Sequence, residues 1–87
     1  MRKQDYCYVV SVVGVKGDRI IEHRVAGCAL NEIDGEKYLN RECEHLELKG
    51  CELVDSWESP TLCVYMYDDG EKTYEVRFVK SALMGWY

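Results

Sequence analysis

The sequence has a single proline, a single phenylalanine and no tract rich in serine and glycine. Linkers between domains are commonly rich in such residues, so nothing divides the 87 residues into two domains. A chain of this length buries only about 60% of its unfolded surface, which leaves a thin core and little room for a deep cleft. We therefore expect one domain, residues 1–87, that is not an enzyme.

The sequence also lacks a long apolar run, since a spanning helix needs about 20 apolar residues. Its amino terminus imitates a secretion signal, with Arg2 and Lys3 before an apolar run and a lipobox-like Val25–Cys28. Charged residues between Lys16 and Arg24 interrupt the stretch that such a signal needs to be apolar. The odd number of cysteines, five, fits a reducing compartment. These absences predict a soluble, cytoplasmic protein without membrane contact.

Familiar catalytic and cofactor motifs are missing as well. No serine lies in a Gly-x-Ser-x-Gly elbow, and the seven glycines are scattered singly. A phosphate-binding loop would need several glycines close together. We therefore predict no catalytic residues and no cofactor.

A zinc-binding module is a minor alternative. Cys43, His45 and Cys51 bring two ligand types close together, and Cys28 and His23 could complete the set. Structural zinc sites usually use closely spaced cysteine pairs, whereas this chain has no Cys-x-x-Cys. On a helix, Cys43 and His45 would also point about 200° apart. The sequence favours buried core cysteines and no metal site.

Two hairpins are predicted from the apolar patterns. The run from Tyr6 to Val15 is apolar on both faces, which predicts a central strand covered on both sides. A turn at Lys16-Gly17-Asp18 leads to a return strand from Arg19 to Ala29. In the second hairpin, Asp69-Gly70 predicts a tight turn that puts Tyr67 opposite Lys72 and Tyr65 opposite Tyr74.

One helix and one further strand are predicted between the hairpins. Asp34 is the expected cap of a helix from about Gly35 to Leu48, with an apolar stripe of Leu39, Cys43 and Leu46. Cys51 to Trp57 has the period of two that is typical of a strand.

The fold class is therefore α+β. We predict a strongly curled, antiparallel sheet of four to five strands, in the order β-β-α-β-β-β, with one helix. One helix cannot cover both faces of such a sheet. Either the sheet closes into a small barrel, or its open face meets a second copy or a partner.

Negative charge is concentrated in the middle of the chain. Between Glu32 and Glu58 lie nine of the sixteen acids and three of the eleven bases, and three minus nine leaves a formal charge of −6. Such a field steers association with a basic partner. Direct nucleic-acid binding is not expected, because the chain lacks the basic stripe that phosphate contacts require.

We predict a small acidic protein that binds a basic protein surface, presenting carboxylates as a nucleic acid presents phosphates. In size and charge, though not in any motif, the chain resembles phage-encoded antagonists of host nucleases. This resemblance implies an inhibitor of a nucleic-acid-handling enzyme. The predicted partner-binding residues are Glu36, Glu42, Glu44, Glu47, Glu52, Asp55, Glu58, Trp86 and Tyr87.

A structural or assembly protein is the second hypothesis. Residues 82–87 end the chain on large apolar groups, where termini are more often polar. Trp86 and Tyr87 would either cover the open sheet face or anchor a partner. A homodimer through the open face and the aromatic C-terminus is therefore the alternative prediction.

Overall fold

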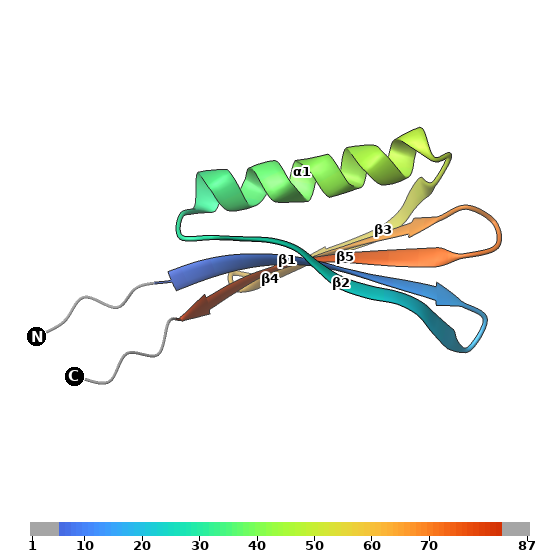
Figure 1. Cartoon of the computed structure of the whole chain (residues 1–87), viewed down its shortest axis with the longest axis horizontal. Coiled ribbons are helices and arrows are strands. Elements are labelled where there is room, and N and C mark those ends of the chain that lie inside the picture. The colour runs from blue at the N-terminus through green and yellow to red at the C-terminus, as the bar shows by residue number, and fades with distance from the viewer. Residues whose placement is uncertain (1–5, 83–87) are drawn as a thin grey trace, which may run out of the picture.

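A computed structural model describes residues 6–82 of the chain (Figure 1). One helix lies across one face of a five-stranded antiparallel sheet, which confirms the predicted α+β class. The elements follow the predicted order along the chain: β1 (Tyr6–Lys16), β2 (Arg19–Ala29), α1 (Glu32–Leu48), β3 (Glu52–Glu58), β4 (Leu62–Asp68) and β5 (Thr73–Ala82). Within this described part, α1 is not long and apolar enough to cross a membrane.

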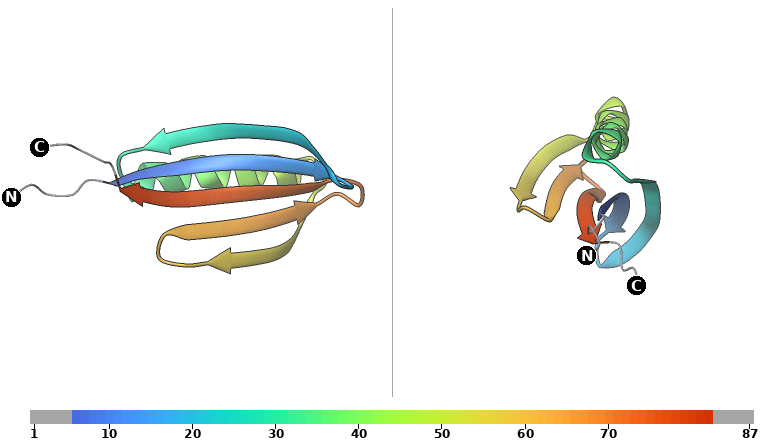
Figure 2. Two further views of the ribbon diagram at one scale, coloured as in Figure 1. Left: turned by 90° about the horizontal axis from the view of Figure 1, so that it is seen from below. Right: turned by 90° about the vertical axis from the view of Figure 1, so that its left-hand side faces the viewer.

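The strands lie in the order β2-β1-β5-β4-β3. The pairing of β1 with β5 joins the two predicted hairpins, and β3 adds to the outer side of β4. The predicted strong curl and the small-barrel variant are wrong, because β2 and β3 stay apart at opposite edges of an open sheet (Figure 2). Every residue of β3 is exposed, so this edge is not covered by another part of residues 6–82.

The two faces of the sheet differ in what covers them. Toward α1, alternate residues of the strands form the core, and Val10, Val12 and Val76 are fully buried. The remaining core residues are Leu39, Leu46, Cys51, Tyr67 and Phe78. We call this side of the sheet the helix face.

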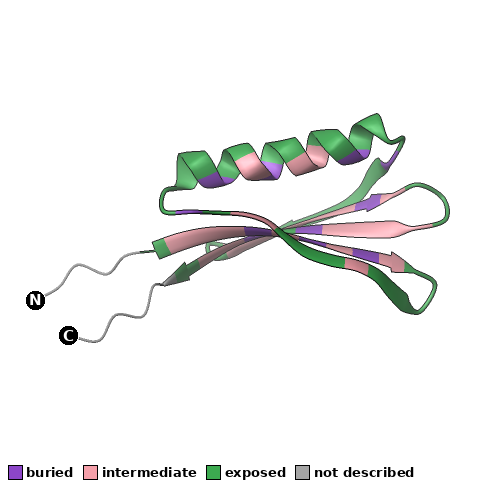
Figure 3. Cartoon of the chain, viewed as in Figure 1, coloured by how far each residue is buried: buried purple, intermediate pink, exposed green. Residues whose placement is uncertain are grey.

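The opposite side, which we call the open face, has no covering element among residues 6–82 (Figure 3). Its apolar residues, which alternate with those of the helix face, include Val9, Val13, Val15, Val64, Met66 and Val79. None of these six is buried. The prediction that the first strand is covered on both sides is therefore wrong within the described residues. The strand is apolar on both faces, so its pattern does not show which side the helix covers.

The helix begins earlier than predicted. Asn31, rather than Asp34, is the cap: its Oδ1 accepts a hydrogen bond from the Asp34 backbone N–H at 2.8 Å. The Asp34 carboxylate lies in the first turn and accepts a bond from Asn31 Nδ2 at 2.9 Å. An acid in the first turn also interacts favourably with the positive end of the helix dipole. The predicted end at Leu48 is confirmed, and Gly50 follows with a φ of 90°.

Two glycines let α1 approach the sheet closely. A Cβ atom on Gly27 of β2 would lie 2.5 Å from the Tyr38 ring, and one on Gly35 of α1 would lie 2.8 Å from Tyr8 Cβ. Both distances are shorter than carbon atoms tolerate without displacement. The position of α1 against the sheet therefore depends on these two residues having no side chain.

The second hairpin has a longer loop than predicted. Asp69 accepts hydrogen bonds from the backbone N–H groups of Glu71 and Lys72 at 2.9 and 2.6 Å, which stabilises a wider turn. Tyr67 consequently pairs with Tyr74, so the predicted partner Lys72 is wrong by two residues. A shift of two keeps every side chain on its predicted face, since side chains alternate with a period of two.

Candidate binding surface

Most acids of the middle segment have no basic partner. Of the nine between Glu32 and Glu58, Asp34 pairs with Lys37 at 3.6 Å and Glu42 pairs with Arg24. Among residues 6–82, the other seven make no ion pair: Glu32, Glu36, Glu44, Glu47, Glu52, Asp55 and Glu58. Their charges are therefore available to a partner.

Three of these acids lie on one side of α1. Glu32, Glu36 and Glu47 are separated by four and eleven residues, spacings that return to the same side of a helix. This side faces β4, because the Tyr67 hydroxyl lies beside the Cys43 thiol and donates to Glu47 Oε1 at 3.4 Å. Together with Glu58 of β3, described next, they form what we call the acidic flank: Glu32, Glu36, Glu47 and Glu58.

Glu58 joins the flank from the sheet. Its register opposite Cys63 places it on the helix face, and its Oε1 accepts a hydrogen bond from the Tyr65 hydroxyl at 3.0 Å. Burial, followed by the nearby Glu58 carboxylate, raises the pKa of Tyr65 to about 12. Burial and the Cys43 thiol likewise raise the pKa of Tyr67. Both hydroxyls therefore stay protonated and can donate at neutral pH.

The helix leaves the helix face of β3 and β4 partly uncovered. α1 packs mainly over β2, β1 and β5. Leu53 of β3 is half exposed, and Tyr65 of β4 is partly buried. The acidic flank therefore borders accessible apolar and aromatic surface, which is a suitable setting for the stem and charged end of a lysine or arginine side chain.

The structure places the other predicted acids elsewhere. Glu42 is largely buried beside Arg24, whereas Glu44 is exposed on the outer side of α1. Glu52 and Asp55 lie on the open face, opposite Asp68 and Met66. A regular strand would have put these two acids on opposite sides, but β3 has a bulge between Leu53 and Asp55.

The aromatic residues do not form one platform. Tyr65, Tyr67 and Tyr74 share the helix face, whereas the register of Trp57 opposite Val64 puts it on the open face. The predicted contact residues Trp86 and Tyr87 lie outside the described residues.

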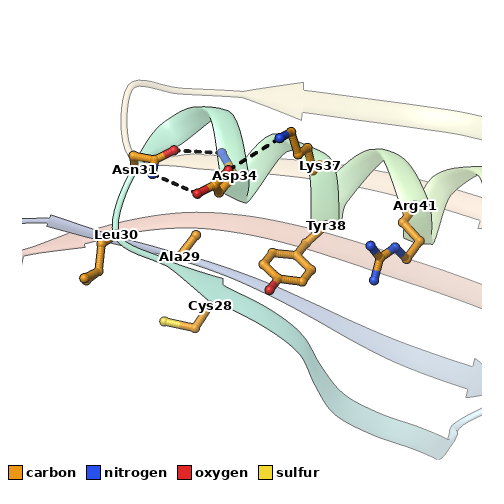
Figure 4. A pocket seen from close by; sticks show the side chains of 8 residues that line it. All are labelled: Cys28, Ala29, Leu30, Asn31, Asp34, Lys37, Tyr38 and Arg41. Carbon is orange, nitrogen blue, oxygen red and sulfur yellow. Dashed lines mark hydrogen bonds and ion pairs between the residues drawn. The ribbon is translucent and has the colours of Figure 1, made fainter.

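A separate pocket of about 500 Å³ lies between the start of α1 and the end of β2 (Figure 4). It was not found from the sequence, because its lining residues are brought together by the chain reversal at Asn31. Asn31, Asp34 and Lys37 bond to one another, and Arg41 lies over the Tyr38 ring at 5.6 Å. The polar groups of this pocket therefore already have partners: those at the start of α1 form its cap, and Arg41 packs on Tyr38. The residues that line the pocket are Cys28, Ala29, Leu30, Asn31, Asp34, Lys37, Tyr38 and Arg41.

The cysteines are all free thiols. Burial raises the pKa of Cys43, Cys51 and Cys63, which disfavours the nucleophilic thiolate. In the described part of the chain, no three histidine, cysteine or acidic side chains come together to hold a metal ion. Cys43 faces the core beside Tyr67, whereas His45 is exposed, as the helical spacing predicts.

Comparison with protein-family models, with curated proteins and with solved structures gives no match. Function is therefore argued from the geometry of this chain alone.

Proposed function

We propose that the protein works by binding a basic protein surface through its acidic flank, Glu32, Glu36, Glu47 and Glu58. The observation that carries this proposal is that four carboxylates, which make no ion pair among residues 6–82, lie on the β4 side of α1 and at the end of β3, where Glu58 bonds to the partly exposed Tyr65. Glu44 extends the negative charge onto the outer side of α1. A groove that binds nucleic-acid phosphates is the kind of surface that fits, so inhibition of a nucleic-acid-handling enzyme is the proposed outcome.

The chemistry of the flank favours cationic side chains. Carboxylates form charge-assisted hydrogen bonds with arginine and lysine. The ring of Tyr65 and the aliphatic side chain of Leu53 offer surface on which an arginine plane or a lysine stem can pack. Net charge alone would attract a cation to any part of this protein, which carries −5 overall. The flank adds a defined place where charge and apolar contact coincide.

A local charge reversal tests the proposal. The Glu36→Lys variant should lower the affinity for an arginine- and lysine-rich peptide about five- to tenfold at low salt, and the difference should shrink as salt is raised. Asp18→Lys is the matched control, because Asp18 is an exposed acid in the turn before β2 and the substitution changes net charge equally. At about 0.1 M salt this control should change the affinity less than about twofold, since charges beyond roughly 10 Å are screened at that ionic strength.

Two results would contradict the proposal. Equal losses in the two variants would show that the peptide responds only to net charge. Binding of duplex DNA by the wild-type chain at low salt would show that the acidic flank does not act in place of phosphates. Isothermal titration calorimetry at several salt concentrations distinguishes these outcomes.

A further inference from the structure

The open face is an apolar feature that the acidic flank does not use. Its central apolar residues come from three neighbouring strands and surround Glu75 and Arg77 of β5: Val13 and Val15 on β1, Val79 on β5, and Val64 and Met66 on β4. Neighbouring side chains on the sheet partly cover these five residues, yet none of the five is buried. Toward the edges, Val25 of β2 and Trp57 of β3 are 67% and 57% exposed. Apolar surface of this extent on one side of a sheet indicates an interaction site.

We propose that a second copy of this chain covers the open face, forming a two-fold symmetric sandwich of two sheets with an α1 on each outer side. The proposal goes beyond the acidic flank, since it concerns the opposite face of the sheet and a different partner. Sheets that pack face to face in this way are about 10 Å apart and have roughly aligned strands.

The area of the open face suits a stable dimer. Five strands at a spacing of about 4.8 Å make a sheet about 24 Å wide. Strands of seven to eleven residues are about 23–36 Å long. The face therefore offers about 600–800 Å², close to the roughly 800 Å² that each partner buries in a standard interface.

The strand order makes the face self-complementary. β5 is the middle strand, so a two-fold axis along β5 places β1 of one copy over β4 of the other. These are the strands that carry most of the apolar residues of the face. The same rotation places β2 of one copy over β3 of the other. Opposite edges of the sheet therefore meet, and each contact occurs twice, as an isologous interface requires.

Charge at the edges of the sheet favours this orientation over the alternative two-fold. On the open face β3 presents Glu52 and Asp55, whereas β2 presents His23 and no acid, because Arg19, Glu22 and Arg24 lie on the helix face. On the open face, His23 of β2 would meet Glu52 and Asp55 of the copy's β3. A two-fold axis across the strands would instead put the acids of β3 against each other. Because the axis runs along β5, Glu75 and Arg77, which form an ion pair at 3.1 Å within each copy, each lie over their own counterpart in the other copy.

Sedimentation equilibrium of the full chain tests the dimer. The wild type should have twice the monomer mass of 10.1 kDa at micromolar concentration. Val13→Lys should weaken the dimer at least about 30-fold while keeping the thermal unfolding transition of the monomer, because it buries a charge only in the dimer. Leu48→Lys is the matched control: Leu48 is 87% exposed at the end of α1, and this variant should stay dimeric.

A charge exchange tests the orientation and does not depend on the folding of the Val13 variant. His23→Glu and Asp55→Lys should each weaken the dimer about tenfold, and combining them should restore it to within about threefold of the wild type. Loss without recovery in the double variant would overturn the arrangement. A wild type that remains at 10.1 kDa at every concentration would overturn the dimer. If removal of residues 83–87 then allowed that monomer to dimerise, the carboxyl-terminal segment would be the true occupant.

Discussion

The helix face and the open face consist of alternate residues of the same strands, yet all the fully buried strand residues lie on the helix face. Val12 is 1% exposed and belongs to the core, whereas its neighbour Val13 is only partly buried on the other side. Both are β-branched, apolar and central in β1. The difference comes from α1, which covers one face and leaves the other uncovered among residues 6–82. In this protein, apolar β-branched side chains favour the strand conformation. The position of α1 then determines which alternate residues of that strand form the core.

Adjacent residues of β5 provide the largest test of this difference. Phe78→Ala should destabilise the protein by about 3–5 kcal/mol, because it leaves a cavity under α1 where the ring stacks on Tyr8. Val79→Ala on the open face should cost about 1 kcal/mol or less in dilute solution, since its side chain is already partly hydrated. Urea unfolding measures both. Similar losses would mean that the two faces are equally buried.

The contact between α1 and the sheet can be disturbed from the β2 side. Gly27→Ala should cost about 1–3 kcal/mol, because the added methyl group would lie 2.5 Å from the Tyr38 ring. In a Tyr38→Ala background the same substitution should cost much less, since the ring is absent. A double-mutant cycle by urea unfolding measures the coupling. Additive changes in the free energy of unfolding would show that this close contact does not determine the position of α1 on the sheet.

Loss of the N-terminal cap of α1 should destabilise the protein less than the Gly27 substitution. Asn31→Ala should cost about 1 kcal/mol, because it removes the acceptor of the Asp34 N–H. Asn40→Ala is the control on the exposed side of α1, and it should be neutral or slightly stabilising because alanine favours helices. Thermal unfolding monitored by circular dichroism compares them. Equal losses at the two positions would argue against Asn31 as the cap.

The smallest predicted effect is a change in the pKa of Tyr65, which lies on the partly uncovered part of the helix face. The phenol of Tyr65 should ionise near pH 12, by ultraviolet absorbance. Its pKa in the unfolded chain is near 10, so the unfolded state loses this proton first and the stabilising contribution declines between about pH 10 and 12. Glu58→Gln should lower the pKa toward its usual value without restoring it fully, because burial is the larger cause. An unchanged pKa would contradict the hydrogen bond to Glu58.

Local patterns predicted the elements well. The period of two in the strands, the turn at Gly17-Asp18 and the stripe of Leu39, Cys43 and Leu46 each depend on neighbours within a few residues, and each is confirmed. Asn31 was missed as the cap because Asp34, three residues later, is an equally good capping residue by type. The register of the second hairpin was missed because the Asp69 side chain widens the turn.

The arrangement of the candidate site could be predicted only in part. The sequence located the acids of α1, but Glu42 proved to pair with Arg24, a contact between residues eighteen positions apart. The bulge in β3 brought Glu52 and Asp55 to the same face, which a regular period of two cannot show. The pairing of β1 with β5 spans most of the chain, and it creates the open face. Such long-range contacts leave no local pattern in the sequence.

The most direct measurement of the difference between the two faces is hydroxyl-radical footprinting of Met66 and Tyr67 at increasing protein concentration. These neighbours on β4 point to opposite faces, and Tyr67 is 3% exposed. Our account predicts that Tyr67 is protected at every concentration, whereas Met66 becomes protected only as the dimer forms. Oxidation of Met66 that is independent of concentration, or oxidation of Tyr67 at the same rate as Met66, would contradict it.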